Sequence, residues 1–353
     1  MQDNEGKILV GITMGDINGI GPELIIKIFE DNRMLQVCTP VIYGSGKVLN
    51  YYRKSLNVKE FYYNTIKSID QVQYKKLNLI NCLEDEPMIE VGVATDAVGK
   101  YAFNFLKTAC QDLQDGKLDA LVTAPINKAT MQQEGFRYPG HTEYLADTFK
   151  SNDSLMILMS GSLRVTFVTG HVAVKNIADN ISKEIILKKL KSFNDSLKKD
   201  FRLRKPMIAV LGLNPHSGDN GLLGNEEKEI IIPAIKEAFE SGIMAYGPFS
   251  ADGLFGSANF NKYDGVLAMY HDQGIVPFKT MAFNTGVNFT GGLSIVRTSP
   301  DHGTAYDIAG KGIADESSFR EAIYAAIDIC QTRMEFEEIN SNPLKFTKHN
   351  SDR

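Results

Sequence analysis

Three of the six histidines in this chain stand in the same kind of position. His171 closes the segment RVTFVTGH, His216 closes MIAVLGLNPH and His271 closes GVLAMYH, so each follows a run with the composition of a β-strand. In an open α/β sheet, the carboxyl ends of the strands form the edge where ligands bind. Three imidazoles at one edge can bind a divalent metal and leave positions open for a substrate. The shared placement predicts a metal site, although any one of these histidines taken alone is better explained as an ordinary loop residue.

Asp272 directly follows His271 and has two interpretations. A carboxylate beside a metal-binding histidine can hold the imidazole ring in the orientation that the metal needs. A carboxylate at that position can equally cap the turn that follows the strand. The sequence leaves both open.

A second group of residues has the chemistry of an anion site. In YPGHTEYLAD, a loop enters a predicted helix at Gly140, His141 and Thr142. Free backbone N–H groups and the helix dipole at such a start favour a phosphate or a carboxylate. Thr142 has the simpler alternative of being an N-cap residue.

Further cations lie in a glycine-rich stretch, VPFKTMAFNTGVNFTGGLSIVRTSPDHGTA. It supplies Lys279, Asn288 and Arg297, which we expect in non-helical segments. The lysine and the arginine could hold a phosphate and a carboxylate, the arginine through two parallel hydrogen bonds.

Short β-rich apolar runs alternate with longer helical patterns, which is typical of an α/β protein with a mostly parallel sheet. The helical patterns carry apolar residues at every third or fourth position. The predicted strands are Ile8 to Thr13, Pro40 to Tyr43, Ala120 to Thr123, Leu155 to Met159, Arg164 to Thr169, Met207 to Leu211 and Gly265 to Met269. The predicted helices are Pro22 to Phe29, Ala97 to Leu113, Lys183 to Leu197, Glu226 to Ser241 and Ser317 to Thr332.

A classical dinucleotide-binding motif is missing. GITMGDINGIGPE follows the first strand and opens a helix, but Gly19, Gly21 and Leu24 do not complete G-x-G-x-x-G. These glycines, with Pro22 at the first helical position, are explained by a tight turn. The segment GSGKVL also lacks the rest of a phosphate-loop motif.

Composition narrows the class of protein. A chain of 353 residues with a net charge of −5 has no basic surplus for nucleic acid, and its apolar runs are too short to span a membrane.

Its length favours two lobes, which we expect to be intertwined α/β units within residues 1–336, followed by a polar C-terminal tail at 337–353. The scattered cysteines indicate free thiols and a cytoplasmic location. These are Cys38, Cys82, Cys110 and Cys330.

Together the motifs resemble those of the 4-hydroxythreonine-4-phosphate dehydrogenases of pyridoxal phosphate biosynthesis. The resemblance runs in order over nearly the whole chain. It is carried by TMGDINGIGPE, TAPINK, GHTEYLAD, TGHVAV, GLNPHSGDNGLLGNEE, GPFSAD, YHDQG and the run from Pro277 to Ala305. One departure is Ile17 and Asn18, where the family has a Pro–Ala pair.

The resemblance implies a role for each matching residue. The family's metal ligands fall on His171, His216 and His271, the same three histidines that placement selects. A catalytic aspartate suggested for the family falls on Asp252, which by sequence alone could only cap the next helix. The family's substrate-binding positions fall on His141, Thr142, Lys279, Asn288 and Arg297.

The resemblance also implies a fold and an activity. The fold is that of isocitrate and isopropylmalate dehydrogenases, two α/β lobes with a cleft between them, which explains the missing dinucleotide motif. The expected reaction is oxidation and decarboxylation of 4-phosphohydroxy-L-threonine to 3-amino-2-oxopropyl phosphate. It uses NAD or NADP and a divalent metal, Zn, Mg or Co, in a homodimer with shared active sites.

Three alternatives remain open from the sequence. A paralogue acting on 4-phosphothreonate or 4-phosphoerythronate would use the same metal and phosphate residues. A phosphate acyltransferase could share an α/β architecture, because fold does not fix function, but it has no need of three metal ligands. A metal- or phosphate-binding module without catalytic activity is the third alternative.

Overall fold

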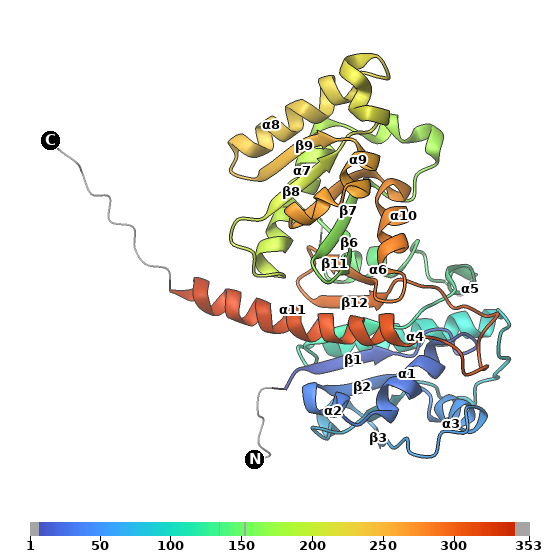
Figure 1. Ribbon diagram of the computed structural model, residues 1–353. Coiled ribbons are helices and arrows are strands. Elements are labelled where there is room, and N and C mark those ends of the chain that lie inside the picture. Colours follow the sequence, from blue (N-terminus) through green and yellow to red (C-terminus); the bar gives the residue numbers. More distant parts are fainter. Residues whose placement is uncertain (1–6, 134, 152, 343–353) are drawn as a thin grey trace.

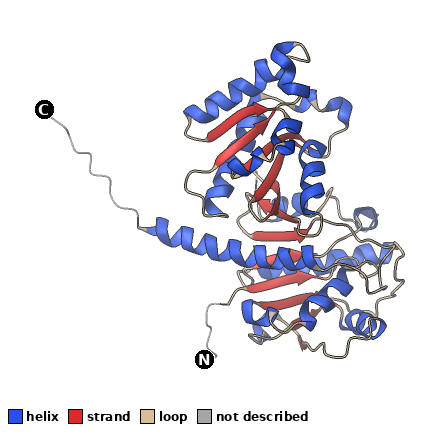
Figure 2. Ribbon diagram, in the orientation of Figure 1, coloured by secondary structure: helices blue, strands red, loops and turns tan. Residues whose placement is uncertain are grey.

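The computed structural model describes residues 7–133, 135–151 and 153–342 of the chain (Figure 1). Helices cover the faces of a large sheet, as the alternating sequence pattern predicts (Figure 2). The strands are β1 Leu9–Thr13, β2 Thr39–Gly44, β3 Asn64–Ile66, β4 Asn78–Asn81, β5 Ala120–Thr123, β6 Leu155–Ser160, β7 Leu163–Thr169, β8 Met207–Leu211, β9 Met244–Phe249, β10 Gly265–Tyr270, β11 Val287–Gly291 and β12 Val296–Pro300. The helices are α1 Gly21–Glu30, α2 Met34–Val37, α3 Gly46–Ser55, α4 Asp96–Gln114, α5 Lys128–Gln133, α6 His141–Thr148, α7 Lys183–Lys199, α8 Ile232–Glu240, α9 Ala251–Gly256, α10 His271–Ala282 and α11 Ser317–Ser341.

The strands of the described residues form one sheet in the order β3-β4-β2-β1-β5-β12-β11-β6-β7-β10-β8-β9. Most neighbours run parallel, but β11 is antiparallel to both β12 and β6, and β6 is antiparallel to β7. All seven predicted strands are present, within a residue or so of the expected bounds. The sequence did not predict β3, β4, β9, β11 and β12.

One continuous sheet runs through both lobes of the molecule (Figure 1). The N-terminal lobe is built from β1 to β5, and the chain then crosses to the second lobe at β6. It returns through β12, which pairs with β5, and through α11, which packs on β12, β5 and β1. That helix continues to Ser341, into the segment expected to be a polar tail, and residues 343–353 lie outside the described part of the chain.

Local sequence explains how two of the helices begin. In α1, Pro22 stands in the first turn beside Glu23, where a missing N–H and a negative charge are both favourable. Gly21 at its start lies so close to the first strand that a β-carbon there would stand 2.5 Å from the carbonyl oxygen of Met14. In α7, the Ser182 hydroxyl accepts a hydrogen bond from the Ile185 amide and caps the helix.

One expectation about the glycine-rich stretch is wrong. Lys279 lies in the last turn of α10, whereas Asn288 and Arg297 lie in β11 and β12 as non-helical residues. Pro277 stands inside α10 and conceals the helix from sequence reading, because proline normally marks a helix boundary.

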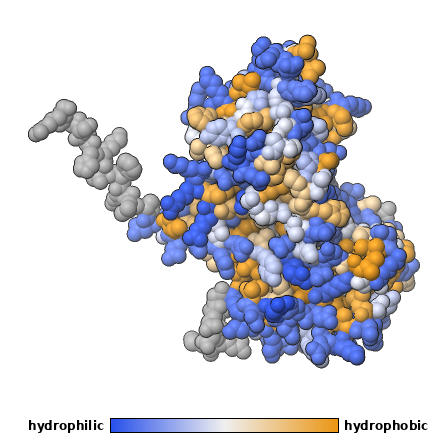
Figure 3. Space-filling view, viewed as in Figure 1, coloured by the Kyte–Doolittle hydropathy of each residue, from blue (hydrophilic) through white to orange (hydrophobic). Residues whose placement is uncertain are grey.

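The four cysteines are free thiols. Burial raises the pKa of each of them to about 12, so none is a reactive thiolate near neutral pH. Among the described residues, none of the helices combines the length and the apolar character needed to cross a membrane. The face in Figure 3 is mostly hydrophilic, with apolar groups at the waist between the lobes and on the N-terminal lobe.

Candidate functional site

Two of the three selected histidines come together at the carboxyl edge of the sheet. His171 follows β7 and His271 follows β10, and these strands are neighbours in the sheet. Their ring centroids are 5.9 Å apart, so one cation could contact both imidazoles. Burial is the main cause that lowers the pKa of His171, and Lys128 adds to it, which favours the neutral form that a metal needs.

Asp272 orients the imidazole of His271. Its Oδ1 atom lies 2.6 Å from Nδ1 of that ring, so the contact leaves Nε2 of His271 available for a metal. Since the carboxylate reaches the ring itself, the first of the two interpretations of Asp272 is the one that the geometry supports.

His216 does not join this pair within the described part of one chain. It is an exposed residue of the turn Pro215–Gly221 that follows β8, where five successive residues from His216 to Asn220 have positive φ. No group of three or more histidine, cysteine or acidic side chains suited to a metal forms among the described residues. A cavity of about 680 Å³ is lined by His171, His271 and Asp272, and His216 is not among its lining residues.

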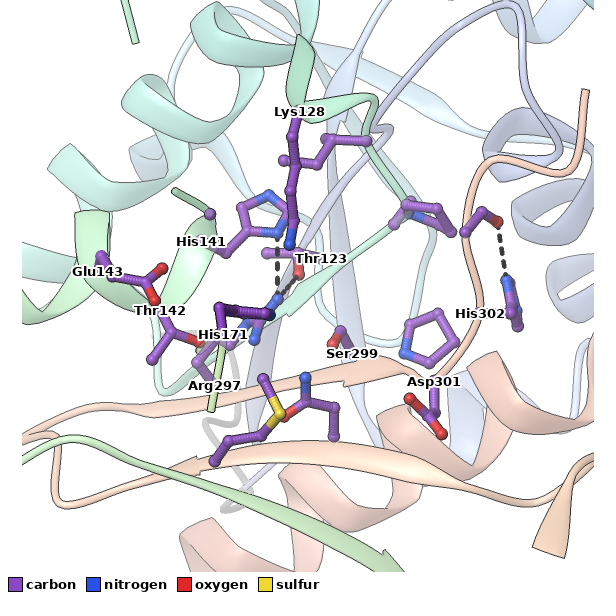
Figure 4. A pocket seen from close by; sticks show the side chains of 18 of the residues that line it. Thr123, Lys128, His141, Thr142, Glu143, His171, Arg297, Ser299, Asp301 and His302 are labelled. Carbon is purple, nitrogen blue, oxygen red and sulfur yellow. Dashed lines mark hydrogen bonds between the residues drawn. The ribbon is translucent and has the colours of Figure 1, made fainter. Parts of the chain in front are cut away.

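A smaller cavity of about 270 Å³ lies between the start of α6 and the strands β5, β11 and β12 (Figure 4). It brings together all five predicted substrate-binding residues, His141, Thr142, Lys279, Asn288 and Arg297. Gly140 is the N-cap of α6, so Thr142 lies in the first turn and the interpretation of Thr142 as the N-cap is wrong. The extended backbone of Gly140 places the first free N–H groups of the helix at the cavity. His171 lines this cavity and the larger one, so it stands in the wall between them.

Arg297 supplies a buried positive charge to the smaller cavity. Its side chain is only 3% exposed, and its terminal nitrogens donate to the hydroxyls of Thr123 and Thr290 at 2.6 and 3.2 Å. Its Nε has no hydrogen-bond partner. Burial lowers the pKa of this guanidinium to about 10, which still leaves it charged at neutral pH. A buried cation with an open donor favours an anion in the cavity.

Two other predicted residues offer complementary groups. The buried Oδ1 of Asn288 has no hydrogen-bond partner, so a ligand with a donor group would satisfy it. Lys279 donates to the carbonyl oxygen of Asp301 at 3.2 Å and lies 3.5 Å from its carboxylate, which neutralises part of its charge. The cavity therefore offers both donors and acceptors.

Asp252 lies apart from this constellation. It is an exposed residue in the first turn of α9, and neither cavity has it among its lining residues.

The cavity also contains side chains that sequence reasoning did not select: Lys128, Glu143, Asp301 and His302. Lys128 could have been found, because TAPINK directly follows the strand Ala120 to Thr123 and so belongs at the same sheet edge as the histidines. Nothing in the sequence distinguished the other three from ordinary helix and loop residues.

Comparison with known proteins identifies the family. The family model described as pyridoxal phosphate biosynthetic protein PdxA matches residues 36–326. The chain belongs to the PdxA family. A 4-hydroxythreonine-4-phosphate dehydrogenase of Bacteroides thetaiotaomicron is 52% identical over 342 residues, covering 97% of this chain and 94% of the relative.

Other members of the PdxA family carry two different substrate names. The solved structure of a 4-hydroxythreonine-4-phosphate dehydrogenase from Klebsiella pneumoniae matches with a TM-score of 0.81 and 33% identity, covering 93% of this chain and 99% of that one. An Oceanobacillus iheyensis protein named "Putative D-threonate 4-phosphate dehydrogenase" is 40% identical over 331 residues, covering 93% of this chain and 99% of the relative. The family is therefore one of oxidoreductases, and its members differ in the phosphorylated acid named as substrate.

Proposed function

We propose that this chain oxidises and decarboxylates 4-phosphohydroxy-L-threonine to 3-amino-2-oxopropyl phosphate, with NAD or NADP as oxidant and a divalent metal as cofactor. The observation that carries the proposal is the position of His171 in the wall between the anion cavity and the cavity that contains His271. A small substrate anchored by its phosphate in the first cavity would present its carbon chain to the histidine pair. The relative at 52% identity bears the name of this activity.

The residues present fit a divalent metal. His171 and His271 supply imidazole nitrogens, and Asp272 holds the second ring in place, which is a common arrangement around zinc. A bound Zn, Mg or Co ion would acidify the substrate hydroxyl and polarise the ketone that forms from it. Imidazole ligands favour zinc over magnesium in this set.

The chain's own residues divide the remaining tasks. His141, Thr142 and Arg297 bind anionic oxygens of the substrate, and Lys279 and Asn288 of the same cavity fix its other groups. With the substrate held, hydride passes from its carbinol carbon to the nicotinamide and the hydroxyl proton passes to a base. The β-keto acid then loses CO₂, and the electrons of the broken bond take up a proton at carbon.

We propose that Asp252 carries the proton, because it matches the aspartate suggested as catalytic for the family. It lies outside both cavities of its own chain, so it would act at the site of a second copy.

We further propose that the active form is a homodimer in which His216 completes the metal site of the partner subunit. In one chain His216 is exposed and separate from the histidine pair. Strongly exposed apolar residues follow each of the three histidines, with Val174 84%, Leu222 78% and Val276 58% exposed. Large apolar side chains left this exposed favour a surface that another protein chain covers.

The nearest competing function is oxidation of a phosphorylated sugar acid, because relatives bear the name of a threonate 4-phosphate dehydrogenase. A side-by-side assay of NAD and NADP reduction with 4-phosphohydroxy-L-threonine, 4-phosphothreonate and 4-phosphoerythronate tests the proposal. We expect the highest kcat/KM with the amino acid. A higher value with either sugar acid would replace the proposed substrate, and no reduction with any of them would favour a binding module.

A further inference from the structure

Lys128 presents a positive charge to the anion cavity beside the start of α6. It is the first residue of α5, and its side chain reaches toward His141 in Figure 4. Its side chain lines the same cavity as the rings of His141 and His171. No hydrogen bond or ion pair engages Lys128 within the described ranges of the chain.

The ammonium lies beside the start of α6. Gly140 has no side chain, and a β-carbon at that position would stand 3.7 Å from Nζ of Lys128. The free N–H groups at the start of an α-helix attract anions, and a nearby ammonium strengthens that attraction. Arg297 contributes a second cation to the same cavity, and its Nε is open.

The neighbouring carboxylate does not neutralise Lys128. Oε2 of Glu143 stands 3.4 Å from the same point at Gly140, but it forms no ion pair with the lysine within the described residues. Lys279, another cation of the cavity, is already engaged with Asp301. Lys128 is therefore a cation of this cavity whose charge remains available to a ligand.

We propose that Lys128 binds the phosphate group of the substrate, together with the start of α6 and Arg297. The inference rests on the proposed function only for the identity of the phosphorylated substrate. A dianionic phosphate matches two cations and a helix start better than the substrate's singly charged carboxylate does.

A chain of hydrogen bonds holds the segment that carries this lysine. Asn127 caps α5 through its Oδ1, which accepts from the Ala129 amide at 3.0 Å, while its Nδ2 donates to the Tyr306 hydroxyl at 3.2 Å. Tyr306 in turn donates to the buried carboxylate of Asp16. Asp16 belongs to GITMGDINGIGPE. This segment does not complete a dinucleotide-binding motif, but through Asp16 it helps to hold the start of α5 in position.

Close packing of a neighbouring helix adds to this support. A β-carbon on Gly99 of α4 would stand 2.3 Å from the carbonyl oxygen of Thr130 in α5. Because the two backbones touch, α5 has little freedom to carry Lys128 away from the cavity. A lysine that contributes only to solubility does not require a helix held in place by such hydrogen bonds and packing.

Calorimetric titration with inorganic phosphate tests the proposal without depending on catalysis. We expect Lys128→Gln to weaken phosphate binding about tenfold or more, the loss expected for one charge-assisted hydrogen bond. Lys128→Arg should retain most of the affinity. Lys107→Gln, which removes an exposed lysine on the neighbouring helix α4, is the matched control and should bind phosphate like the unaltered protein.

Kinetics of the holoenzyme provide the second measurement. The same glutamine variant should raise KM for the phosphorylated substrate more than it lowers kcat, because the lysine binds the phosphate, whose bonds do not change in the reaction. Tyr306→Phe should weaken phosphate binding in the unaltered background and add little when Lys128 is already replaced, since both changes act through one ammonium. Unchanged phosphate affinity in Lys128→Gln would overturn the proposal, whatever the substrate of the enzyme proves to be.

Discussion

The guanidinium of Arg297 donates a hydrogen bond to Nδ1 of His141 across 3.2 Å. Arginine has donors only, so Nδ1 must be the acceptor and the imidazole must carry its proton on Nε2. The contact therefore exists only while the ring is neutral. Burial and the charge of Arg297 both lower the pKa of His141 well below its usual 6.5, in agreement with that requirement.

This relationship predicts how stability depends on pH. A histidine whose pKa is lower in the folded chain binds its proton more readily when unfolded, so folding loses stability as the pH falls from about 6.5 through the folded pKa. The free energy of unfolding, measured with urea between pH 7.5 and 5, should fall more steeply in the unaltered protein than in His141→Asn. The difference in slope can reach about 1.4 kcal/mol per pH unit. Parallel curves would contradict the inferred protonation.

Replacing Arg297 tests the geometry of the buried cation. Arg297→Lys keeps a charge but loses the donors to Thr123 and Thr290, and it has no second nitrogen for a substrate oxygen. We expect kcat/KM to fall by an amount equivalent to about 1 to 3 kcal/mol of transition-state binding. Arg320→Lys, on α11 outside the cavity, should have little effect. An unchanged kcat/KM in the first variant would remove Arg297 from the substrate site.

The shared metal site predicts a specific pattern of rescue. Any of the three histidines replaced by alanine should reduce both metal content and activity. Mixing His171→Ala with His216→Ala under subunit exchange should restore up to about half of the heterodimer's sites, because one site regains a full set. Mixing His171→Ala with His271→Ala should restore none, because those ligands come from the same chain.

Metal analysis and sedimentation provide the outcomes that contradict this arrangement. Full metal content with normal turnover in His216→Ala would exclude that residue from the site. Rescue of the His171 and His271 pair would show that a different ligand crosses between subunits. A fully active monomer would exclude a metal site shared between subunits, but it would not contradict the dehydrogenase activity.

A buried ion pair away from the site predicts a stability effect. Arg333 of α11 donates to Asp200 at 2.7 Å, with both side chains less than a tenth exposed. Arg333→Met would leave a buried carboxylate without its cation, and we expect the free energy of unfolding to fall by about 3 kcal/mol or more. Lys199→Met, which breaks an exposed pair with Glu337, should change it by less than about 1 kcal/mol. Equal losses of unfolding free energy in the two variants, measured by urea denaturation, would show that burial does not determine how much these ion pairs stabilise the protein.

The sequence predicted the elements that have strong periodic patterns. The apolar strands β5 and β8 match their predicted bounds at both ends, and α7 begins at the predicted residue behind its Ser182 cap. Short strands such as β3, with one buried residue, offered too little pattern to detect. The helical setting of Lys279 was hidden by Pro277, a residue that breaks most helices.

For the site, the family resemblance selected five residues that share the anion cavity, and it left the other lining residues and the hydrogen-bond partners undetermined. Placement at strand ends selected His171 and His271, because the sheet order that joins β7 to β10 follows from ordinary parallel pairing. Asp16 escaped notice because its role depends on contact with Tyr306, a residue far along the chain, whereas the position of Lys128 after β5 could have selected it. No local pattern records such contacts.

The return of the chain through β12 and α11 has a consequence for its synthesis. The N-terminal lobe leaves the ribosome first, yet its strand β5 remains an open edge until Val296–Pro300 arrives to pair with it. The apolar surface that α11 covers on β1, β5 and β12 is also bare until then. Nascent chains that stall before this point carry an unpaired strand edge, which is a template for aggregation. The first lobe to be translated is thus among the last parts of the protein to finish folding.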